Sequence, residues 1–221
     1  MADAAPRYLR EPPDVRPAIV GCLEHKGAIG DAEVQASLLL LVAEGALEQR
    51  ESTRRVTTIA GAHDVPTMEL RHAPDRWDSL DIVDRELLAF LFDAIGGAGA
   101  LSLADVQATV HHRPDAFAAG MQRWRLAVVT HAEELGLMRG DRLTEAGKAA
   151  RDRHDAFRRY LHDFGTLEDE PPVAVALWGP YLAYAVLFGL GDRVARALDP
   201  GGPGPAANPN LATWKAWFGL N

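Results

Sequence analysis

Histidine pairs are the residues whose type and spacing come nearest to metal chemistry in this chain. His111 and His112 are adjacent in a segment expected to be helical. Neighbouring helical side chains point about 100° apart, so these two imidazoles do not converge on one ion. His154 and His162 lie two turns apart on a later predicted helix, but no cysteine or carboxylate completes a ligand set. We therefore expect solvent-exposed imidazoles at a helix end, no metal site and no cofactor.

No cysteine or serine has the sequence setting of a catalytic nucleophile. The single cysteine, Cys22, lies in an apolar helical segment and is expected to be a small buried residue. One cysteine also excludes an internal disulfide framework. The serines lack the Gly-x-Ser-x-Gly setting of hydrolases, and the glycine-rich segments 96–99 and 201–204 lack the strand and lysine of a phosphate loop. The sequence thus predicts a protein without enzymatic activity.

Four arginines form the densest basic patch, which is the candidate anion or phosphate site: Arg151, Arg153, Arg158 and Arg159. Asp152 and Asp155 dilute it, so a charge-laced solvent face is one interpretation. An acidic partner or an anionic membrane surface is another. The whole chain carries 23 basic against 31 acidic residues, a net charge of −8, which argues against nucleic acid as a partner.

An aromatic tip lies at the end of the chain. Residues 200–210 are rich in proline and glycine and predict a flexible linker. Trp214, Trp217 and Phe218 follow it, and aromatic side chains dominate the energetics of protein interfaces. These three residues are the candidate anchors for an unidentified protein partner, unless the tip folds back onto the domain.

Hydrophobic periodicity predicts a mainly α protein with small β-hairpins, built as two winged-helix-like units plus C-terminal helices. Residues 1–16 are expected to form an extended leader, 17–73 a reduced winged-helix-like unit, and 78–165 a second such unit with a trailing helix. Residues 173–198 then form a packed apolar C-terminal helix, and 199–221 the linker and aromatic tail.

Apolar spacing and capping residues place the individual elements. Helices are expected over 18–24, 32–44, 81–95, 104–110, 114–135 and 145–164, and one continuous helix runs from Tyr181 to Leu198. Short strands are expected at 46–49, 54–59 and 67–71, with a turn at 61–64, and a tight hairpin at 137–143.

The uncharged run 173–190 raises the question of a membrane-spanning helix. It is at the lower edge of the roughly 20 residues that span a bilayer, and Gly179-Pro180 interrupts it near its start. A buried or amphipathic helix is favoured, with an interfacial helix or a true span as alternatives. The N-terminus shows no apolar core behind a basic start, so no signal peptide is expected.

Four sequence motifs follow one another along the chain. They are residues 10–21 (REPPDVRPAIVG), the apolar helix ending at 38–47 (LLLLVAEGAL), 156–161 (AFRRYL) after a Leu-Thr-x-x-Gly turn, and 181–190 (YLAYAVLFGL). Together they resemble the cytosolic C-terminal region of the domain-of-unknown-function 2207 family of predicted bacterial membrane proteins. Ala183 stands where that family usually has proline. The family supplies no catalytic residues to transfer.

The resemblance implies a cytosolic, membrane-tethered domain of unknown biochemical role. Whether the chain is part of a longer protein or a freestanding relative stays open, as does its oligomeric state. We expect a non-catalytic protein-interaction domain, cytoplasmic, at the cytosolic face of a membrane protein. The alternative is a winged-helix DNA-binding transcriptional regulator that places the four arginines on the DNA backbone.

Overall fold

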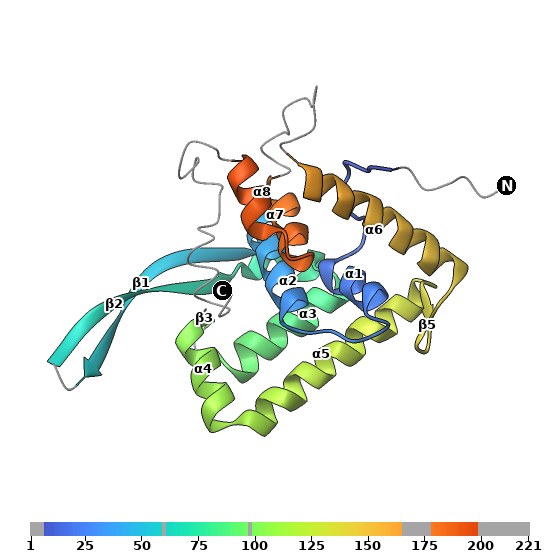
Figure 1. Ribbon diagram of the computed structural model, residues 1–221. Helices are drawn as coiled ribbons and strands as arrows, with labels where there is room; N and C mark the ends of the chain where they lie inside the picture. Colours follow the sequence, from blue (N-terminus) through green and yellow to red (C-terminus); the bar gives the residue numbers. More distant parts are fainter. Residues whose placement is uncertain (1–6, 59–60, 97–98, 165–177, 199–221) are drawn as a thin grey trace.

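A helical body and a long projecting β-hairpin make up the computed structural model, which describes residues 7–58, 61–96, 99–164 and 178–198 (Figure 1). The prediction of a mainly α protein with small antiparallel strand pairs is confirmed. The helices are α1 (Pro17–Glu24), α2 (Asp31–Ala43), α3 (Ile82–Leu88), α4 (Leu103–His112), α5 (Pro114–Glu134), α6 (Glu145–Asp163), α7 (Trp178–Leu187) and α8 (Gly191–Leu198). A 3₁₀ turn, η1 (Pro74–Ser79), precedes α3, and a π-helical turn, η2 (Ala89–Asp93), continues it.

Helix α2 lies at the centre of the body. Its residues 38–41 are four consecutive leucines, and all of them are buried. Four consecutive helical positions point in all directions around the axis, so the helix is stable only when it is covered on every side. Helices α1 and α7 and the start of β1 (Leu47–Thr58) supply that cover.

The hydrophobic core joins elements that are distant in sequence. Leu23 and Leu41, from the first predicted unit, belong to the same buried cluster as Trp124 and Val128 of α5. A second cluster is aromatic: Phe157 and Tyr160 of α6, together with Phe164 just after it, pack edge-to-face against the two tyrosines of α7. Helix α7 contacts α2 as well, so it connects the two clusters.

The strands differ from the prediction in length and number. β1 pairs antiparallel with β2 (Gly61–His72) over twelve residues each, from Leu47 opposite His72 to Thr58 opposite Gly61. The predicted turn at 61–64 is wrong, because these residues pair with 55–58. β3 (Ala100–Ser102) was not expected as a strand, and it pairs with residues 69–71 of β2. A second, two-stranded sheet joins β4 (Met138–Arg139) and β5 (Arg142–Leu143), as the sequence predicts.

The predicted continuous helix from Tyr181 to Leu198 is also wrong. Helix α7 ends at Leu187, and Gly189 adopts a left-handed conformation with φ of 70°. The amide of Leu190 donates to the carbonyl of Ala185 and that of Gly189 to the carbonyl of Val186, which is the hydrogen-bond pattern of a glycine-terminated helix. Helix α8 starts afresh at Gly191.

The described part of the leader, residues 7–16, forms neither helix nor strand, and its backbone accepts hydrogen bonds from side chains of both α6 and α7. The hydroxyl of Tyr181 donates to the carbonyl of Arg10 at 2.7 Å, and that of Tyr184 donates to the carbonyl of Val15 at 2.6 Å. Buried hydroxyl groups are costly without a partner. The leader backbone therefore completes the hydrogen bonding of the aromatic cluster.

Candidate functional site

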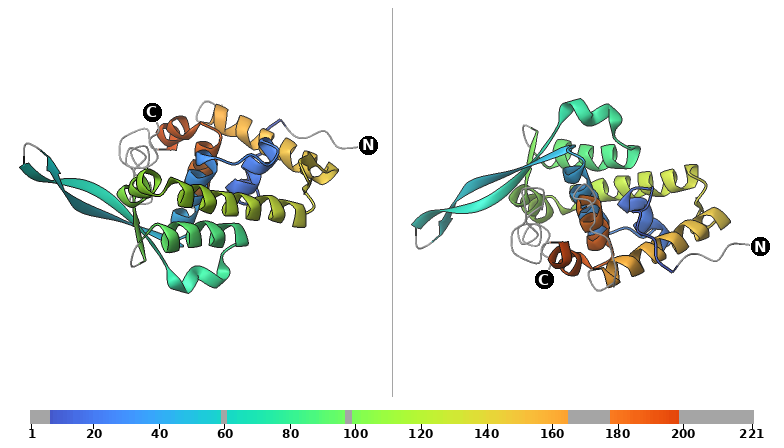
Figure 2. Two further views of the ribbon diagram at one scale, coloured as in Figure 1. Left: turned by 90° about the horizontal axis from the view of Figure 1, so that it is seen from below. Right: turned by 90° about the horizontal axis from the view of Figure 1, so that it is seen from above.

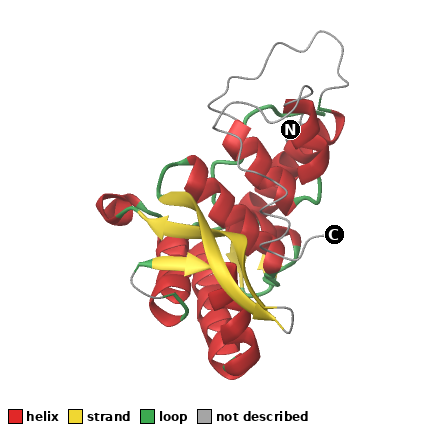
Figure 3. Ribbon diagram, turned by 90° about the vertical axis from the view of Figure 1, so that its left-hand side faces the viewer, coloured by secondary structure: helices red, strands yellow, loops and turns green. Residues whose placement is uncertain are grey.

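The most prominent feature is the distal part of the β1–β2 hairpin, residues 51–58 and 61–68, which we call the arm. β3 pairs with β2 only at 69–71, so among the described strands those of the arm pair only with each other. At about 3.3 Å per residue, eight residues extend the hairpin by about 26 Å beyond the three-stranded part. Figure 1 and both views of Figure 2 show it standing away from the helices, and in Figure 3 the strands lie in front of the helices, on the side that faces the viewer.

The base of the arm is fixed in the body. Leu47 and Leu70 are buried in the main core at its inner end. Beside them, Arg50 lies opposite Glu69 in the strand register, and each of these residues also forms an ion pair along its own strand. Opposite charges on facing strand positions stabilise a pair of strands. The arm is thus a projection on a firm base, with exposed residues such as Thr53 further out.

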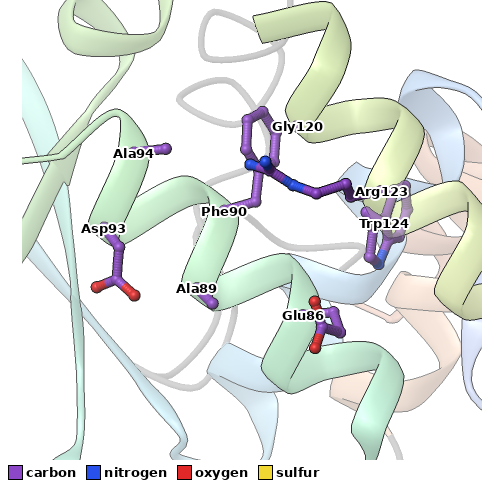
Figure 4. Close-up of a pocket in the computed structure, with 8 residues that line it drawn as sticks. All are labelled: Glu86, Ala89, Phe90, Asp93, Ala94, Gly120, Arg123 and Trp124. Carbon is purple, nitrogen blue, oxygen red and sulfur yellow. The ribbon is translucent and has the colours of Figure 1, made fainter. Parts of the chain in front are cut away.

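A groove lies in the helical body, between α3–η2 and α5. Figure 4 shows the eight residues that line this pocket of about 300 Å³. Its floor is the buried ring of Phe90 and the indole of Trp124, whose Nε1 donates to the carbonyl of Val83 at 3.1 Å. Gly120 lies against the Phe90 ring, which occupies the space that a Cβ would need. Glu86 and Asp93 of the rim are exposed.

We expect Gly120→Ala to lower the free energy of unfolding by about 1–3 kcal/mol, because the added methyl overlaps the Phe90 ring and overpacks the helix contact. The double variant Gly120→Ala/Phe90→Leu frees that space and recovers part of the loss. Urea denaturation monitored by tryptophan fluorescence measures both. Equal stability of Gly120→Ala and the native chain contradicts the close contact.

The structure does not bring the four predicted arginines onto one surface. Arg158 forms a 2.7 Å ion pair with Asp155 of the same helix, and Arg159 donates from Nε to the carbonyl of Arg7 in the leader. Arg151 is half-buried, and about 200° of helical rotation separates it from the exposed Arg153. Arg151 and Arg158 are seven residues apart and thus share a face of α6, whereas Arg153 lies on the opposite face, and Arg158 and Arg159 take part in intramolecular contacts.

The other candidate residues lie in varied settings. The predicted anchors Trp214, Trp217 and Phe218 lie outside the described residues. Cys22 is buried as predicted, and burial raises the pKa of its thiol to about 11. His154 is buried as well, and burial lowers the pKa of its imidazole to about 4.

The predicted exposure of His111 and His112 is confirmed. Within the described ranges 7–58, 61–96, 99–164 and 178–198, no three histidine, cysteine or acidic side chains are placed to hold a metal ion.

Sequence reasoning missed a buried ion pair between the leader and α3. Asp84 is 1% exposed, and its Oδ2 lies 2.6 Å from Nε of Arg16. The same guanidinium contacts both carboxylate oxygens of Glu44, at 2.7 and 3.0 Å. Asp84 stands on the apolar stripe of its helix, one turn before Leu87 and Leu88, and this position is the signal that could have revealed a buried charge.

Asp84 gives the protein a pH-dependent stability. Burial raises the pKa of its carboxyl to about 7, above the ordinary value of 3.8, and Arg16 offsets only part of the rise. Between about pH 4 and pH 7 the folded protein holds this proton while the unfolded chain releases it, so the contribution of Asp84 to stability falls as pH rises.

We expect Asp84→Asn to remove this dependence, which amounts to at most about 1.4 kcal/mol per pH unit. Urea denaturation of both proteins at pH 5 and pH 8 measures it. The native chain is expected to lose more stability between these two values than Asp84→Asn, and parallel behaviour of the two proteins contradicts the buried carboxyl.

A family model covers nearly all of these elements. Residues 5–142 and 135–198 match the family described as the predicted membrane protein (DUF2207) C-terminal domain. The chain belongs to this family. Both the arm and the Arg16–Asp84 pair of this DUF2207 C-terminal domain lie inside the matched residues. No curated protein and no solved structure matches the chain.

The family description raises the question of membrane spans. Among the described residues of this DUF2207 C-terminal domain, no helix has both the length and the apolar character needed to cross a bilayer. The described part of the uncharged run, helix α7, has most of its residues buried against α2 and α6. Its apolar side chains are therefore used in the protein core.

Proposed function

We propose that this DUF2207 C-terminal domain is a non-catalytic protein-interaction domain at the cytosolic face of a membrane protein, and that the arm is its contact element. The observation that carries the proposal is the length of β1 and β2 beyond the short strand β3. The cytosolic side rests on the family resemblance of the sequence motifs.

An isolated two-stranded hairpin is marginally stable in water. The arm leaves β1 as an outer strand of the described sheet, so its backbone N–H and C=O groups are available to another strand. Addition of a strand to such an edge is a common mode of protein recognition. A projection of this length is therefore better suited to contact a partner than to support its own body.

The buried titratable groups favour a non-catalytic role. Asp84 and His154 have the most strongly shifted pKa values among the carboxyl and imidazole groups with resolved shifts, and both side chains are almost fully buried. Asp84 forms an ion pair with Arg16. If the first winged-helix-like unit bound DNA, α2 would be its recognition helix, but α2 is covered by α1, α7 and β1. A protein partner is thus better supported than DNA.

Site-specific photo-crosslinking in the cells that make the protein tests the proposal. A photoreactive amino acid replaces Thr53 of the arm or, as the matched control, Gln122 on the exposed face of α5. We expect a discrete light-dependent protein adduct from position 53 and none from position 122. The absence of an adduct from position 53, or the same adducts from both positions, overturns the proposal.

A further inference from the structure

We infer that the arm pairs with the arm of a second copy of this chain, with β1 antiparallel to β1 of the other copy about a two-fold axis at Thr53. This inference rests on the proposed function, because it names the partner of the arm. It is carried by the free edge of β1, by the charge pattern of that strand and by the way the arm stands away from the body.

β1 is the edge suited to pairing. It contains neither glycine nor proline over its twelve residues, so every position has a backbone N–H and a side chain to support a neighbouring strand. β2 contains Pro66, opposite Thr53, and proline cannot donate a ladder hydrogen bond. β3 also covers the inner end of β2, whereas β1 is an outer strand of the described sheet along its whole length.

Symmetry limits how two copies of β1 can pair. A two-fold axis perpendicular to the sheet keeps each residue on its own face, and side chains alternate between faces with a period of two. The sequence numbers of two facing residues must therefore differ by an even number. At the axis, one residue then faces the same residue of the other copy. Closed two-fold dimers are the commonest symmetric assembly of soluble proteins.

Charge selects one of these registers. With the axis at Thr53, residue Glu51 of each copy faces Arg55 of the other, and no like charges are opposed. An axis one or two residues towards Leu47 sets Arg50 opposite Arg54 or Glu51 opposite Glu51, and an axis one or two residues the other way sets Arg54 opposite Arg54 or Arg55 opposite Arg55. Directly opposed like charges destabilise a strand pair, whereas opposite charges stabilise it. The charges thus favour a second copy in the Thr53-centred register.

The body does not obstruct this pairing. Leu47, where β1 enters the core, lies six residues from Thr53, so the two bodies attach about 40 Å apart along the combined ribbon at 3.3 Å per residue. The arm projects clear of the helices in Figure 1 and in both views of Figure 2. The result is a four-stranded antiparallel sheet in the order β2–β1–β1–β2, with one helical body at each end.

Disulfide trapping of the 221-residue chain tests the register. At the axis, Cβ atoms of facing residues are about 5 Å apart, close to the separation that a disulfide needs. The matched control is Arg50→Cys, because Arg50 is also exposed on β1. In the Thr53-centred register, the cysteines at position 50 of the two copies would be six residues apart along the ribbon, about 20 Å. Native Cys22 is buried and does not compete.

Under mild oxidation we expect Thr53→Cys to give a covalent dimer at least about tenfold faster than Arg50→Cys, because only position 53 meets its own copy. Equal rates would indicate random collision and would overturn the inference. A monomeric Thr53→Cys protein under the same oxidant overturns it as well.

A charge swap measured by sedimentation tests the same contact without a cross-link. Glu51→Arg sets like charges opposite Arg55 of the other copy, and we expect it to raise the dimer dissociation constant by about tenfold. The triple variant Glu51→Arg/Arg55→Glu/Asp64→Arg restores opposite charges both between copies and within the hairpin, where Arg55 faces Asp64.

Asp64→Arg alone disturbs only the hairpin pair and serves as the control, with the dimer retained. Circular dichroism establishes that each variant keeps the native fold. Failure of the triple variant to restore the native dissociation constant, or a chain that sediments as a monomer, overturns the inference.

The photo-crosslinking experiment separates this inference from the proposed function. An adduct from position 53 at twice the mass of the chain supports both. An adduct of a different mass identifies another partner, which overturns the second-copy inference and leaves the interaction role in place. No adduct overturns both proposals.

Discussion

Arg16→Ala is expected to lower the free energy of unfolding by about 3–5 kcal/mol at pH 8, because it leaves the carboxylate of Asp84 buried without a counter-charge. Asp84 is 1% exposed, and Arg16 Nε lies 2.6 Å from its Oδ2. The loss should be smaller at pH 5, where the raised pKa of Asp84 keeps its carboxyl protonated. Urea denaturation monitored by tryptophan fluorescence measures the difference.

Two variants locate the origin of this loss. Arg16→Ala/Asp84→Asn removes the buried charge together with its partner, and we expect it to recover most of the lost stability at pH 8. Glu44 contacts the same guanidinium but its side chain is 43% exposed, so Glu44→Gln should cost less than about 1 kcal/mol. A loss from Arg16→Ala that does not change with pH would contradict the role of Asp84.

Gly147→Ala is expected to lower the free energy of unfolding by about 3 kcal/mol or more, the upper end of the cost of overpacking. Gly147 lies in the first turn of α6, and a Cβ there would overlap the carbonyl oxygen of Leu137. That carbonyl cannot easily move, since it accepts from the amide of Thr144 at 3.1 Å and the amide of Leu137 donates to Ala132 at 3.0 Å.

Helix propensity alone predicts that Gly147→Ala stabilises the protein, so the sign of the change in the free energy of unfolding is informative. Alanine in an exposed helix stabilises by about 1 kcal/mol relative to glycine, so any net loss must come from the contact with Leu137. Thermal unfolding followed by circular dichroism measures it. The exposed neighbour Ala146 provides the control, and Ala146→Ser should change stability by less than about 0.5 kcal/mol. A more stable Gly147→Ala protein would contradict the packing of α6 on the hairpin β4–β5.

Local signals in the sequence were sufficient for most helices. Pro17 and Pro114 open α1 and α5, since proline at the first position sacrifices no helical hydrogen bond. Thr144 caps α6 by accepting from the amide of Gly147 at 3.0 Å, and Asp81 caps α3 through the amide of Val83. Caps and apolar periodicity act within a few residues, so a single sequence displays them directly.

Strand lengths could not be read in the same way. The sequence shows alternation near 46–49, 54–59 and 67–71, but whether a residue between these segments joins a strand depends on the residue it faces across the hairpin. Asp64 and Ala62 look like turn residues locally and become strand residues because Arg55 and Thr57 pair with them. β3 likewise exists only because residues 69–71 present a free edge to it.

The sequence by itself determined the class of the protein, its main helices and its family, because helix caps, apolar spacing and motif order are properties of neighbouring residues. Tertiary structure alone decided the features on which the proposals depend. The arm arises from pairing across a hairpin, and the Arg16–Asp84 pair joins residues 68 positions apart. Burial and strand pairing are set by what the chain folds against, and no local pattern contains that information.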